Sequence, residues 1–384
     1  MKPVYIVHCA AVTPLGDTLD TTWQALNASR SAIGPLERFA TKSYVTSLAA
    51  TIPVLEARDG SLLYDLLERL LLQLPALPQD CRLLTATTKG PIDLLEQACR
   101  TTPSPALTPA MLPEAMTGWL QQRLGLAGEA RNINAACASS TAALAQAAAS
   151  IGAGLADTVL VCCADLVSEF VFSGFSALQA LSPAAARPFD PGRQGLTLGE
   201  AAASLLLMSE EAVARSGLTP LARLCGWGAA NDANHITAPA RDGCGLIEAI
   251  GQCLARARQP LEAVAAISAH GTGTVYNDAM EITAFRALWG ELVPPFNSIK
   301  GAVGHTLGAA GGLEAALAVL SLQHAQLPPT VGLQAAEQTV SSMVMSRVQK
   351  VGGDLILSTN SGFGGVNAAI AISRVEPLVT GGNA

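Results

Sequence analysis

The chain has 384 residues, of which 50% are hydrophobic and 14% charged, with a net charge of −7 at pH 7. This length suits two domains, or one large domain built from two halves, and the hydrophobic share excludes a mainly disordered protein. The negative charge argues against nucleic acid as the main partner, and no apolar run reaches the length of a membrane span.

The N-terminal stretch MKPVYIVHCAAVTPLG resembles a signal peptide, because an apolar run follows Lys2. However, His8 interrupts the run, and Pro14 and Gly16 end it. The pattern therefore favours a first strand over residues 4–7 that enters a turn.

Alternating strand and helix patterns follow in the rest of the first half. Apolar spacing predicts helices around Trp23, over 61–74, 114–124 and 141–151, and strands over 131–134, 157–164 and 204–208. In the second half the same reasoning predicts strands over 221–230, 263–268, 296–299 and 354–359, and helices over 245–257 and 312–323.

The order of these elements occurs twice in the chain. RNINAACASSTAALAQAAA (131–149) corresponds to FNSIKGAVGHTLGAAGGLEAALAVL (296–320), and DTVLVCCAD (157–165) corresponds to DLILSTNSG (354–362). This internal duplication predicts an α/β fold in which two related sheets pack with layers of helices. We expect a first half over residues 1–215 and a second half over 216–384.

The nine cysteines show no CxxC spacing, so the sequence predicts neither a zinc knuckle nor a disulfide framework. Cys162 and Cys163 are adjacent, and most of the others stand in apolar contexts. We interpret eight of the nine as small buried hydrophobic residues in a reducing cytoplasm. Cys137 is the exception.

Cys137 lies in a run of small residues between a predicted strand and an Ala-rich helix. A sharp turn there would place the thiol at a helix N-terminus, where free N–H groups and the helix dipole lower a thiol pKa. Small neighbours leave room for a bulky acyl group, and backbone N–H groups can bind an oxyanion. Taken alone, the pattern is also compatible with a buried structural cysteine.

Two histidines in the second half strengthen the catalytic interpretation. His270 directly follows a predicted strand in AHGTGT, and His305 stands in the Gly-rich turn GAVGHTLGAAGG. Lys300 precedes His305 in an apolar, Gly-rich stretch. Each of these residues could instead be structural, and Lys300 could be a surface lysine whose stem covers apolar surface.

Five blocks resemble the β-ketoacyl-acyl-carrier-protein synthases, elongating enzymes of the thiolase superfamily. They are ACASS (136–140), RPFDPGRQG with GEAAASLLL (187–207), AHGTGT (269–274), NSIKGAVGHTLGAAGGLEAAL (297–317) and NSGFGGVNAA (360–369). The blocks follow the family's order across most of the chain. The resemblance implies the thiolase-like fold, with its layered α-β-α-β-α arrangement of two duplicated halves.

The resemblance also implies a reaction. Cys137 would take an acyl chain from a carrier-protein thioester, and malonyl-carrier protein would then lose carbon dioxide and attack the acyl group. His270 and His305 would stabilise the enolate, and the backbone N–H groups of Cys137 and Phe363 would hold the second oxyanion. The product would be a β-ketoacyl-carrier protein.

The other residues take supporting roles by the same resemblance. Lys300 and Glu314 would fix ring orientation and ordered water, Thr272 and Thr274 would contact the phosphopantetheine arm, and Phe363 would act as a gate between flexible glycines. We expect no metal and no cofactor. The expected partners are an acyl carrier protein and a second subunit, in a homodimer or in a heterodimer with a related ketosynthase subunit.

Several positions depart from the family's pattern. Ser361 runs directly into Gly362 where a Phe is usual, Gln194 replaces an aspartate, and Gln179 replaces an arginine that often meets the carrier protein. Residues 56–65 lack the usual basic cluster apart from Arg58, and LLTATTKGPI (83–92) replaces a glycine-rich stretch. These departures favour a specialised polyene or polyketide pathway over housekeeping fatty-acid synthesis.

Two other functions remain open from the sequence. The chain could be a partner subunit that sets chain length for another ketosynthase, although such partners usually lack the reactive cysteine. It could also be a degradative thiolase, although those enzymes use a second cysteine near the C-terminus and the last cysteine here is Cys253. A cysteine hydrolase has less support, because nothing outside the matched blocks favours water activation.

Overall fold

The protein is described from a computed structural model that covers residues 1–102 and 106–375. Hydrogen bonding joins ten strands into one sheet in the order β10-β9-β13-β14-β8-β1-β7-β6-β4-β5. Their bounds are β1 (Val4–Val12), β4 (Arg82–Ala86), β5 (Ala130–Ile133), β6 (Thr158–Asp165), β7 (Ala201–Ser209), β8 (Ala222–Asn231), β9 (Ala266–Ser268), β10 (Phe296–Asn297), β13 (Leu355–Gly362) and β14 (Val366–Ser373). Two short pairs, β2 (Gly34–Pro35) with β3 (Leu48–Ala49) and β11 (Gln326–Leu327) with β12 (Gln349–Lys350), lie outside this sheet.

The strand order shows the duplication directly. Read outward from the centre, the first half gives β1, β7, β6, β4, β5 and the second half gives β8, β14, β13, β9, β10. Counted along the chain, the first of the five strands in each half therefore lies at the centre of the sheet, and the third, β5 or β10, lies at its edge. The halves meet through β1 and β8, which pair antiparallel over only two residues, Tyr5 with Arg223 and Ile6 with Ala222. The two sheets expected from the sequence are thus joined at this narrow seam.

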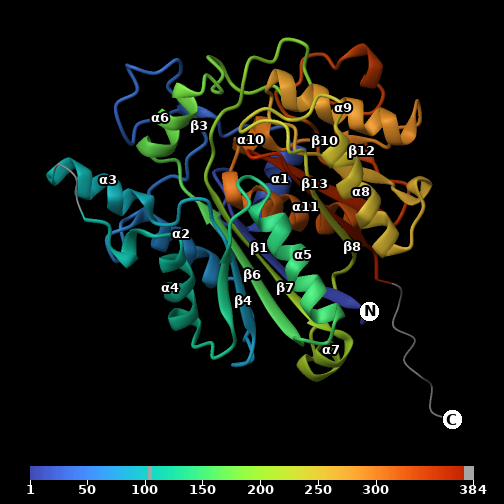
Figure 1. Cartoon of the computed structure of the whole chain (residues 1–384), viewed down its shortest axis with the longest axis horizontal. Coiled ribbons are helices and arrows are strands. Elements are labelled where there is room, and N and C mark those ends of the chain that lie inside the picture. Colours follow the sequence, from blue (N-terminus) through green and yellow to red (C-terminus); the bar gives the residue numbers. More distant parts are fainter. Residues whose placement is uncertain (103–105, 376–384) are drawn as a thin grey trace.

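Two helices form the middle layer of the molecule, α5 (Ser139–Gly152) and α11 (Ala310–His324). Both contact strands of both halves as well as each other, and they share one hydrophobic cluster with residues of both sets of strands. Their many alanines and glycines allow this close approach: a Cβ on Gly312 would lie 2.4 Å from the sulfur of Cys163 on β6. Figure 1 shows these two helices between the two halves.

Further helices cover the outer faces. On the first half, α2 (Leu62–Leu71) and α4 (Glu114–Leu124) pack over a second hydrophobic cluster. On the second half, α8 (Cys244–Ala257) and α9 (Val275–Trp289) pack over a third, and Figure 1 shows the two pairs on opposite sides. The expected layered α-β-α-β-α, thiolase-like arrangement is therefore confirmed. Within the described residues, the remaining α-helices are α1 (Leu19–Asn27), α3 (Ile92–Thr101), α6 (Glu169–Ala177), α7 (Glu210–Ser216) and α10 (Lys300–Val303).

Some sequence-based expectations differ from the structure. The first strand continues to Val12 instead of ending at residue 7, and β4, β14 and α9 were not predicted. The expectation of eight buried cysteines is wrong for Cys99 and Cys244, which are exposed.

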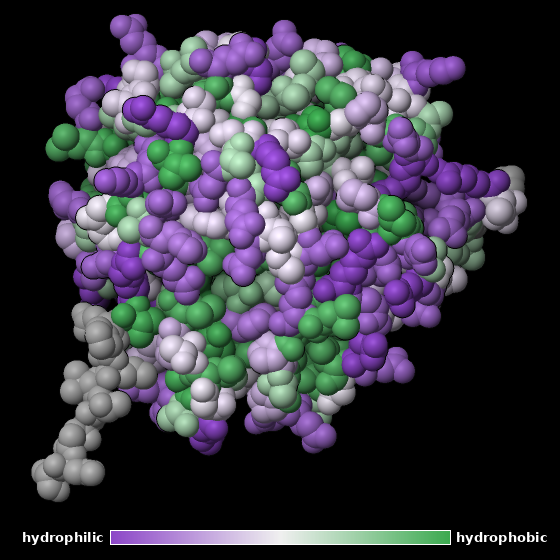
Figure 2. Space-filling view, turned by 180° about the vertical axis from the view of Figure 1, so that it is seen from behind, coloured by the Kyte–Doolittle hydropathy of each residue, from purple (hydrophilic) through white to green (hydrophobic). Residues whose placement is uncertain are grey.

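The last features of the fold are the distribution of hydrophobic residues on the surface and the length of the helices. On the face shown in Figure 2, hydrophilic and hydrophobic residues are interspersed, with some hydrophobic side chains gathered in its lower part. Among the described residues, no helix combines the length and the apolar character that crossing a bilayer requires.

Candidate active site

The turn between β5 and α5 presents Cys137 at the start of the middle layer. Ala136 has a φ of 50°, in the left-handed region that a residue with a side chain rarely adopts. Ser139 stabilises the turn, because its hydroxyl accepts a hydrogen bond from Ala135 N (2.9 Å) and donates one to Ala136 O. Gly362 passes close by, and a Cβ there would lie 3.1 Å from Cys137 N.

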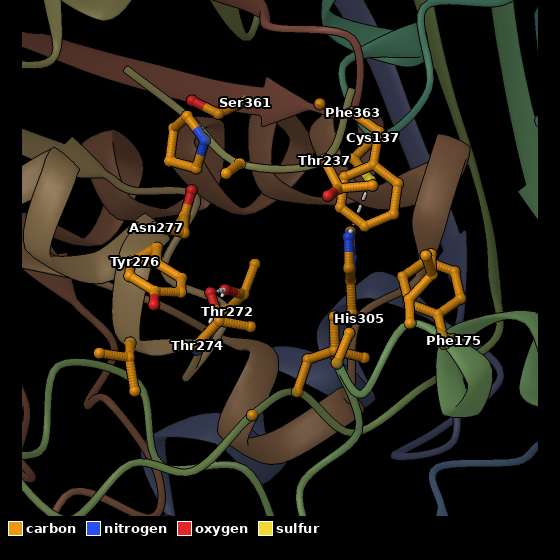
Figure 3. A pocket seen from close by; sticks show the side chains of 18 of the residues that line it. Cys137, Phe175, Thr237, Thr272, Thr274, Tyr276, Asn277, His305, Ser361 and Phe363 are labelled. Atoms are coloured by element: carbon orange, nitrogen blue, oxygen red, sulfur yellow. Dashed lines mark hydrogen bonds between the residues drawn. The ribbon is translucent and has the colours of Figure 1, made fainter. Parts of the chain in front are cut away.

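His305 reaches Cys137 from the second half of the chain. It lies between α10 and the short 3-10 turn at Leu307–Ala309, and its backbone is fixed by hydrogen bonds with Thr197 (2.7 Å) and Gly199 (3.0 Å). Its Nε2 is 3.0 Å from the Cys137 sulfur, the contact drawn as a dashed line in Figure 3. Proton transfer between thiol and imidazole is therefore within direct reach.

His270 completes a triangle with these two residues. It follows β9, and the centroid of its ring lies 5.2 Å from the centroid of the His305 ring. The two rings are at an interplanar angle of 84°. One ligating atom from each of Cys137, His270 and His305 lies within 4.8 Å of the other two. The two halves thus bring together the three residues on which the sequence-based mechanism depends.

Donors from two other residues fix the tautomer of His270. Its Nδ1 lies 3.1 Å from Asn360 Nδ2 and 3.3 Å from Lys300 Nζ. An ammonium group has only donors, so Nδ1 is the acceptor and the proton resides on Nε2. A neutral His270 therefore presents an N–H donor on its other side.

A buried network holds these donors in place. Lys300 forms an ion pair with Glu314 and also donates to His270 O. Asn360 Nδ2 donates to Glu314 Oε2 (2.7 Å), and Thr141 of α5 donates to Asn360 Oδ1. Lys300 is thus a buried partner of the site, and its interpretation as a surface lysine is wrong.

Asn360 was not given a role from the sequence. The signal available was its position as a polar residue directly after the apolar run DLILST. In the structure it lies buried near the end of β13, beside His270.

Two carboxylates position the loop that carries His270. Glu281 accepts hydrogen bonds from His270 N and Gly271 N, both 2.7 Å, and Asp278 accepts from Thr272 N (2.9 Å). Both belong to α9, which the sequence analysis missed, and both are buried. Burial, followed by the charge of Asp278, raises the pKa of Glu281 to about 8.

The pKa of Cys137 differs from the value expected from the sequence, and the two histidines are neutral. Burial raises the pKa of Cys137 to about 11, while the Lys300 charge and the backbone N–H of Phe363 act in the opposite direction. The expectation that the helix N-terminus lowers this pKa is therefore wrong, because loss of hydration outweighs the donors. Burial and the Lys300 charge also lower the pKa of His270 and His305 well below the usual range, so both rings are neutral at pH 7.

A further buried carboxylate, that of Asp165, acts on Cys137. Asp165 ends β6 and accepts hydrogen bonds from Thr87 Oγ1 (2.7 Å), Thr88 N (3.0 Å) and Gly308 N (2.7 Å). Its charge contributes to the raised pKa of Cys137. Gly308 comes three residues after His305, so Asp165 also anchors the turn that carries this histidine. No pattern in the sequence indicates this contact.

A cavity of about 430 Å³ leads to Cys137. Thr272 and Thr274, predicted to contact substrate, line it, and their hydroxyls lie 2.9 Å apart. Phe363, the predicted gate, lines it beside Cys137 and stacks on Phe175 at a centroid distance of 5.6 Å. Figure 3 shows the threonines across the cavity from Cys137 and Phe363. The sulfur therefore faces an open space although Cys137 is only 6% exposed.

The Cys137–His270–His305 cluster is also a set of atoms that one metal ion could reach. One sulfur and two nitrogens are ligands that zinc accepts. The absence of a metal in the working protein stays a prediction, which elemental analysis of the purified protein tests.

Comparison with known families gives two matches. The family model described as the N-terminal domain of beta-ketoacyl synthase matches residues 84–212, and the model of the C-terminal domain matches residues 221–334. The first contains Cys137 and the second contains both histidines.

Individual proteins show the same likeness. A beta-ketoacyl synthase named for granaticin polyketide, from Streptomyces violaceoruber, is 34% identical over 285 residues, which are 71% of this chain and 67% of that protein. A 3-oxoacyl-[acyl-carrier-protein] synthase 2 from Coxiella burnetii is 28% identical over 97% of this chain and 99% of its own length. A solved structure titled as the ishigamide ketosynthase/chain length factor superposes with a TM-score of 0.90 at 27% identity, covering 98% of this chain and 100% of that chain.

Proposed function

Since this chain belongs to the β-ketoacyl synthase family, we propose that it catalyses the decarboxylative Claisen condensation of an acyl thioester with malonyl-carrier protein. The observation that carries the proposal is the contact of 3.0 Å between Cys137 and His305, with His270 beside both. The product is a β-ketoacyl-carrier protein.

The first step loads the acyl chain. The neutral Cys137 thiol attacks the thioester carbonyl, and the carbon–sulfur bond to the carrier breaks. His305 Nε2 takes the thiol proton and passes it to the departing carrier thiolate, so no net proton is consumed. The backbone N–H groups of Cys137 and Phe363 bind the oxyanion of the tetrahedral intermediate.

The second step forms the carbon–carbon bond. The malonyl carboxylate leaves as carbon dioxide, and the electron pair of the broken bond becomes an enolate. His270 donates to the enolate oxygen from Nε2. His305 donates beside it only after its neutral ring has moved its proton from Nδ1 to Nε2 by exchange with solvent, which acylated Cys137, having no proton to offer, no longer opposes. The enolate carbon attacks the acyl carbonyl, the Cys137–acyl bond breaks, and the thiolate regains a proton from solvent. Neutral imidazoles suit this step because they donate without consuming a proton.

A Cys137→Ala variant tests the proposal. With acyl- and malonyl-carrier proteins, we expect the wild type to gain the mass of one acyl group and to release β-ketoacyl-carrier protein. The variant should do neither, whereas Cys99→Ala, which changes an exposed cysteine, should match the wild type. Acylation of the Cys137→Ala variant would contradict the assignment of the nucleophile.

A chain-length-determining partner subunit is the second candidate, favoured by the likeness to a ketosynthase/chain length factor structure. Condensation that is lost with Cys137→Ala, in the chain alone or in its assembled dimer, supports the synthase. Condensation that requires a second subunit and survives Cys137→Ala supports the partner role. A degradative thiolase has less support, because Cys137 is the only cysteine among the described residues that line the cavity.

We propose an acyl carrier protein as the substrate-bearing partner and a dimer, with itself or with a related ketosynthase subunit, as the working assembly. The pathway is a specialised polyene or polyketide route, as the departures from the family pattern indicate. The proposed location is the cytoplasm, which fractionation of the native host tests.

A further inference from the structure

The cavity at Cys137 shares part of its wall with a second hollow whose lining carries charged residues. Among the described residues, those that line the inner cavity include no lysine, arginine, aspartate or glutamate. The outer hollow, of about 670 Å³, shares His235, Ala238, Pro239 and Tyr276 with the inner one and adds Arg241 and Asp242. A substrate that extends from Cys137 through the neutral cavity therefore meets its first formal charges in the outer hollow.

Arg241 is held in place without being neutralised. Its guanidinium carbon lies 6.0 Å from the ring centroid of Tyr276, and Figure 3 shows this ring on the wall opposite Cys137. No carboxylate in residues 1–102 and 106–375 forms an ion pair with Arg241. The neighbouring Asp242 instead accepts a hydrogen bond from Cys244 N (3.1 Å), where α8 begins. The donors of Arg241 therefore remain available to a ligand.

We propose that Arg241 binds the phosphate ester of a phosphopantetheine thioester whose acyl end reaches Cys137. This inference rests on the proposed function. A guanidinium offers paired N–H donors that match phosphate oxygens, and the neutral cavity suits the uncharged remainder of the arm. The chain carries a net charge of −7 and has Gln179 where the resembling family often has an arginine. A cation at the mouth of the cavity therefore supplies attraction that the protein as a whole does not provide.

The experiment compares free thioesters that carry the same acyl group and differ in the phosphate. Acylation of Cys137 is followed by intact mass with acyl-phosphopantetheine and with acyl-pantetheine, for the wild type and for Arg241→Gln. We expect the variant to raise KM roughly five- to tenfold for the phosphorylated donor, since the site is exposed and solvent-screened. The KM for acyl-pantetheine and kcat for both donors should change by less than about twofold.

The control is Arg256→Gln, which removes another arginine held over an aromatic ring, Trp227, at 5.8 Å. Arg256 lines neither hollow, so this variant should not distinguish the two donors. Arg241→Lys should restore part of the preference, because it keeps the charge but not the paired donors.

Each outcome decides the matter. An equal effect of Arg241→Gln on both donors, or no effect on either, overturns the inference. If Arg241→Gln raises KM only with the intact acyl-carrier protein, the inference is also overturned, and Arg241 binds an acidic side chain of the carrier instead. If neither donor acylates the wild type while acyl-carrier protein does, phosphate alone does not recruit the donor and the inference fails. If no donor acylates Cys137, the proposed function itself fails. Where the inference holds, coenzyme A thioesters, which carry the same phosphopantetheine, are compared with acyl-carrier protein. The higher wild-type kcat/KM shows whether the carrier protein or coenzyme A delivers the phosphopantetheine thioester.

Discussion

Two buried charged residues act on the Cys137 thiol in opposite directions. Lys300 lowers its pKa and Asp165 raises it, and burial sets the resulting value near 11. A thiol with such a pKa is mostly protonated at pH 8, so we expect alkylation of the resting protein at Cys137 to be slow. Reaction with substrate instead depends on His305 taking the proton during attack.

Replacing each charge should change alkylation in a predictable direction. We expect Asp165→Asn to lower the pKa of Cys137 and to speed its alkylation by iodoacetamide at pH 8, and Lys300→Met to slow it, each by roughly three- to tenfold. The rate is measured from pH 7 to 11 by mass spectrometry of the Cys137 peptide. Exposed Cys99, followed in the same samples, is the internal control. A change of the same sign in both variants would contradict this electrostatic account.

Glu281 links the site to the pH dependence of stability. Its pKa is about 8 in the folded protein against 4.5 for a glutamate free in water, so the folded state binds the proton more tightly. Between these two values the folded state holds more protons than the unfolded state, and its stability must fall as pH rises. The slope reaches about 1.4 kcal/mol per pH unit at most.

We expect Glu281→Gln to lose this contribution to the slope. Urea unfolding at several pH values between 5 and 8 measures it for both proteins. The glutamine keeps one acceptor for His270 N or Gly271 N, so the variant should still fold. An unchanged slope would show that Glu281 does not titrate in this range.

At the scale of elements, glycines on two helices serve different purposes. Gly312 of α11 faces β6, where a Cβ would come within 2.4 Å of the Cys163 sulfur, whereas Gly251 of α8 has nothing within 4 Å of its Cβ position. Both residues lie inside helices. Replacing each glycine by alanine therefore makes the same change at one closely packed position, Gly312, and at one open position, Gly251.

We expect Gly312→Ala to destabilise the protein by about 1–3 kcal/mol, because an overpacked core has to shift. Gly251→Ala should stabilise it by about 0.5–1 kcal/mol through helix propensity. Chemical denaturation of the two variants beside the wild type measures both. A stabilising Gly312→Ala would show that α11 can move away from β6 at little cost.

The sequence identified elements whose apolar residues form a continuous run or recur at a regular spacing, and missed those shaped by contacts from elsewhere. The apolar run of β6 and the spacing of α2 predicted their types, whereas α9 has buried polar residues such as Asp278 and Glu281 among its apolar ones. These residues are buried because the His270 loop supplies their donors, and no local pattern reveals that. The strand β14, VNAAIAIS, was missed because alanine gives little strand signal.

The same distinction applies to the site. Cys137, His270 and His305 could be predicted because short blocks of sequence surround each of them. Asn360 and Asp165 could not, since their contacts join distant segments, as Asp165 does with Gly308. The pKa of Cys137 was predicted with the wrong sign because the helix terminus can be read from sequence whereas the degree of burial cannot.

On the scale of the whole molecule, the two halves depend on each other. The β1–β8 seam pairs only two residues on each strand, while the main hydrophobic cluster contains residues from both halves and from the helices between them. Neither half can bury its inner face alone. We therefore expect the proposed halves, residues 1–215 and 216–384, to depend on each other for folding and not to be independent folding units.

We expect one cooperative unfolding transition that involves both halves. Guanidinium unfolding is followed by tryptophan fluorescence, and exposure of Cys162 and Cys253, buried in the first and second halves respectively, is followed by pulsed alkylation and mass spectrometry. The three midpoints should coincide, because exposing the inner face of either half removes the core of the other. The fragment 1–215 alone should fail to protect Cys162, although β6 itself lies within it. Separate midpoints for Cys162 and Cys253, or a protected fragment, would show instead that the duplication has left two domains that fold alone and meet only to build the site.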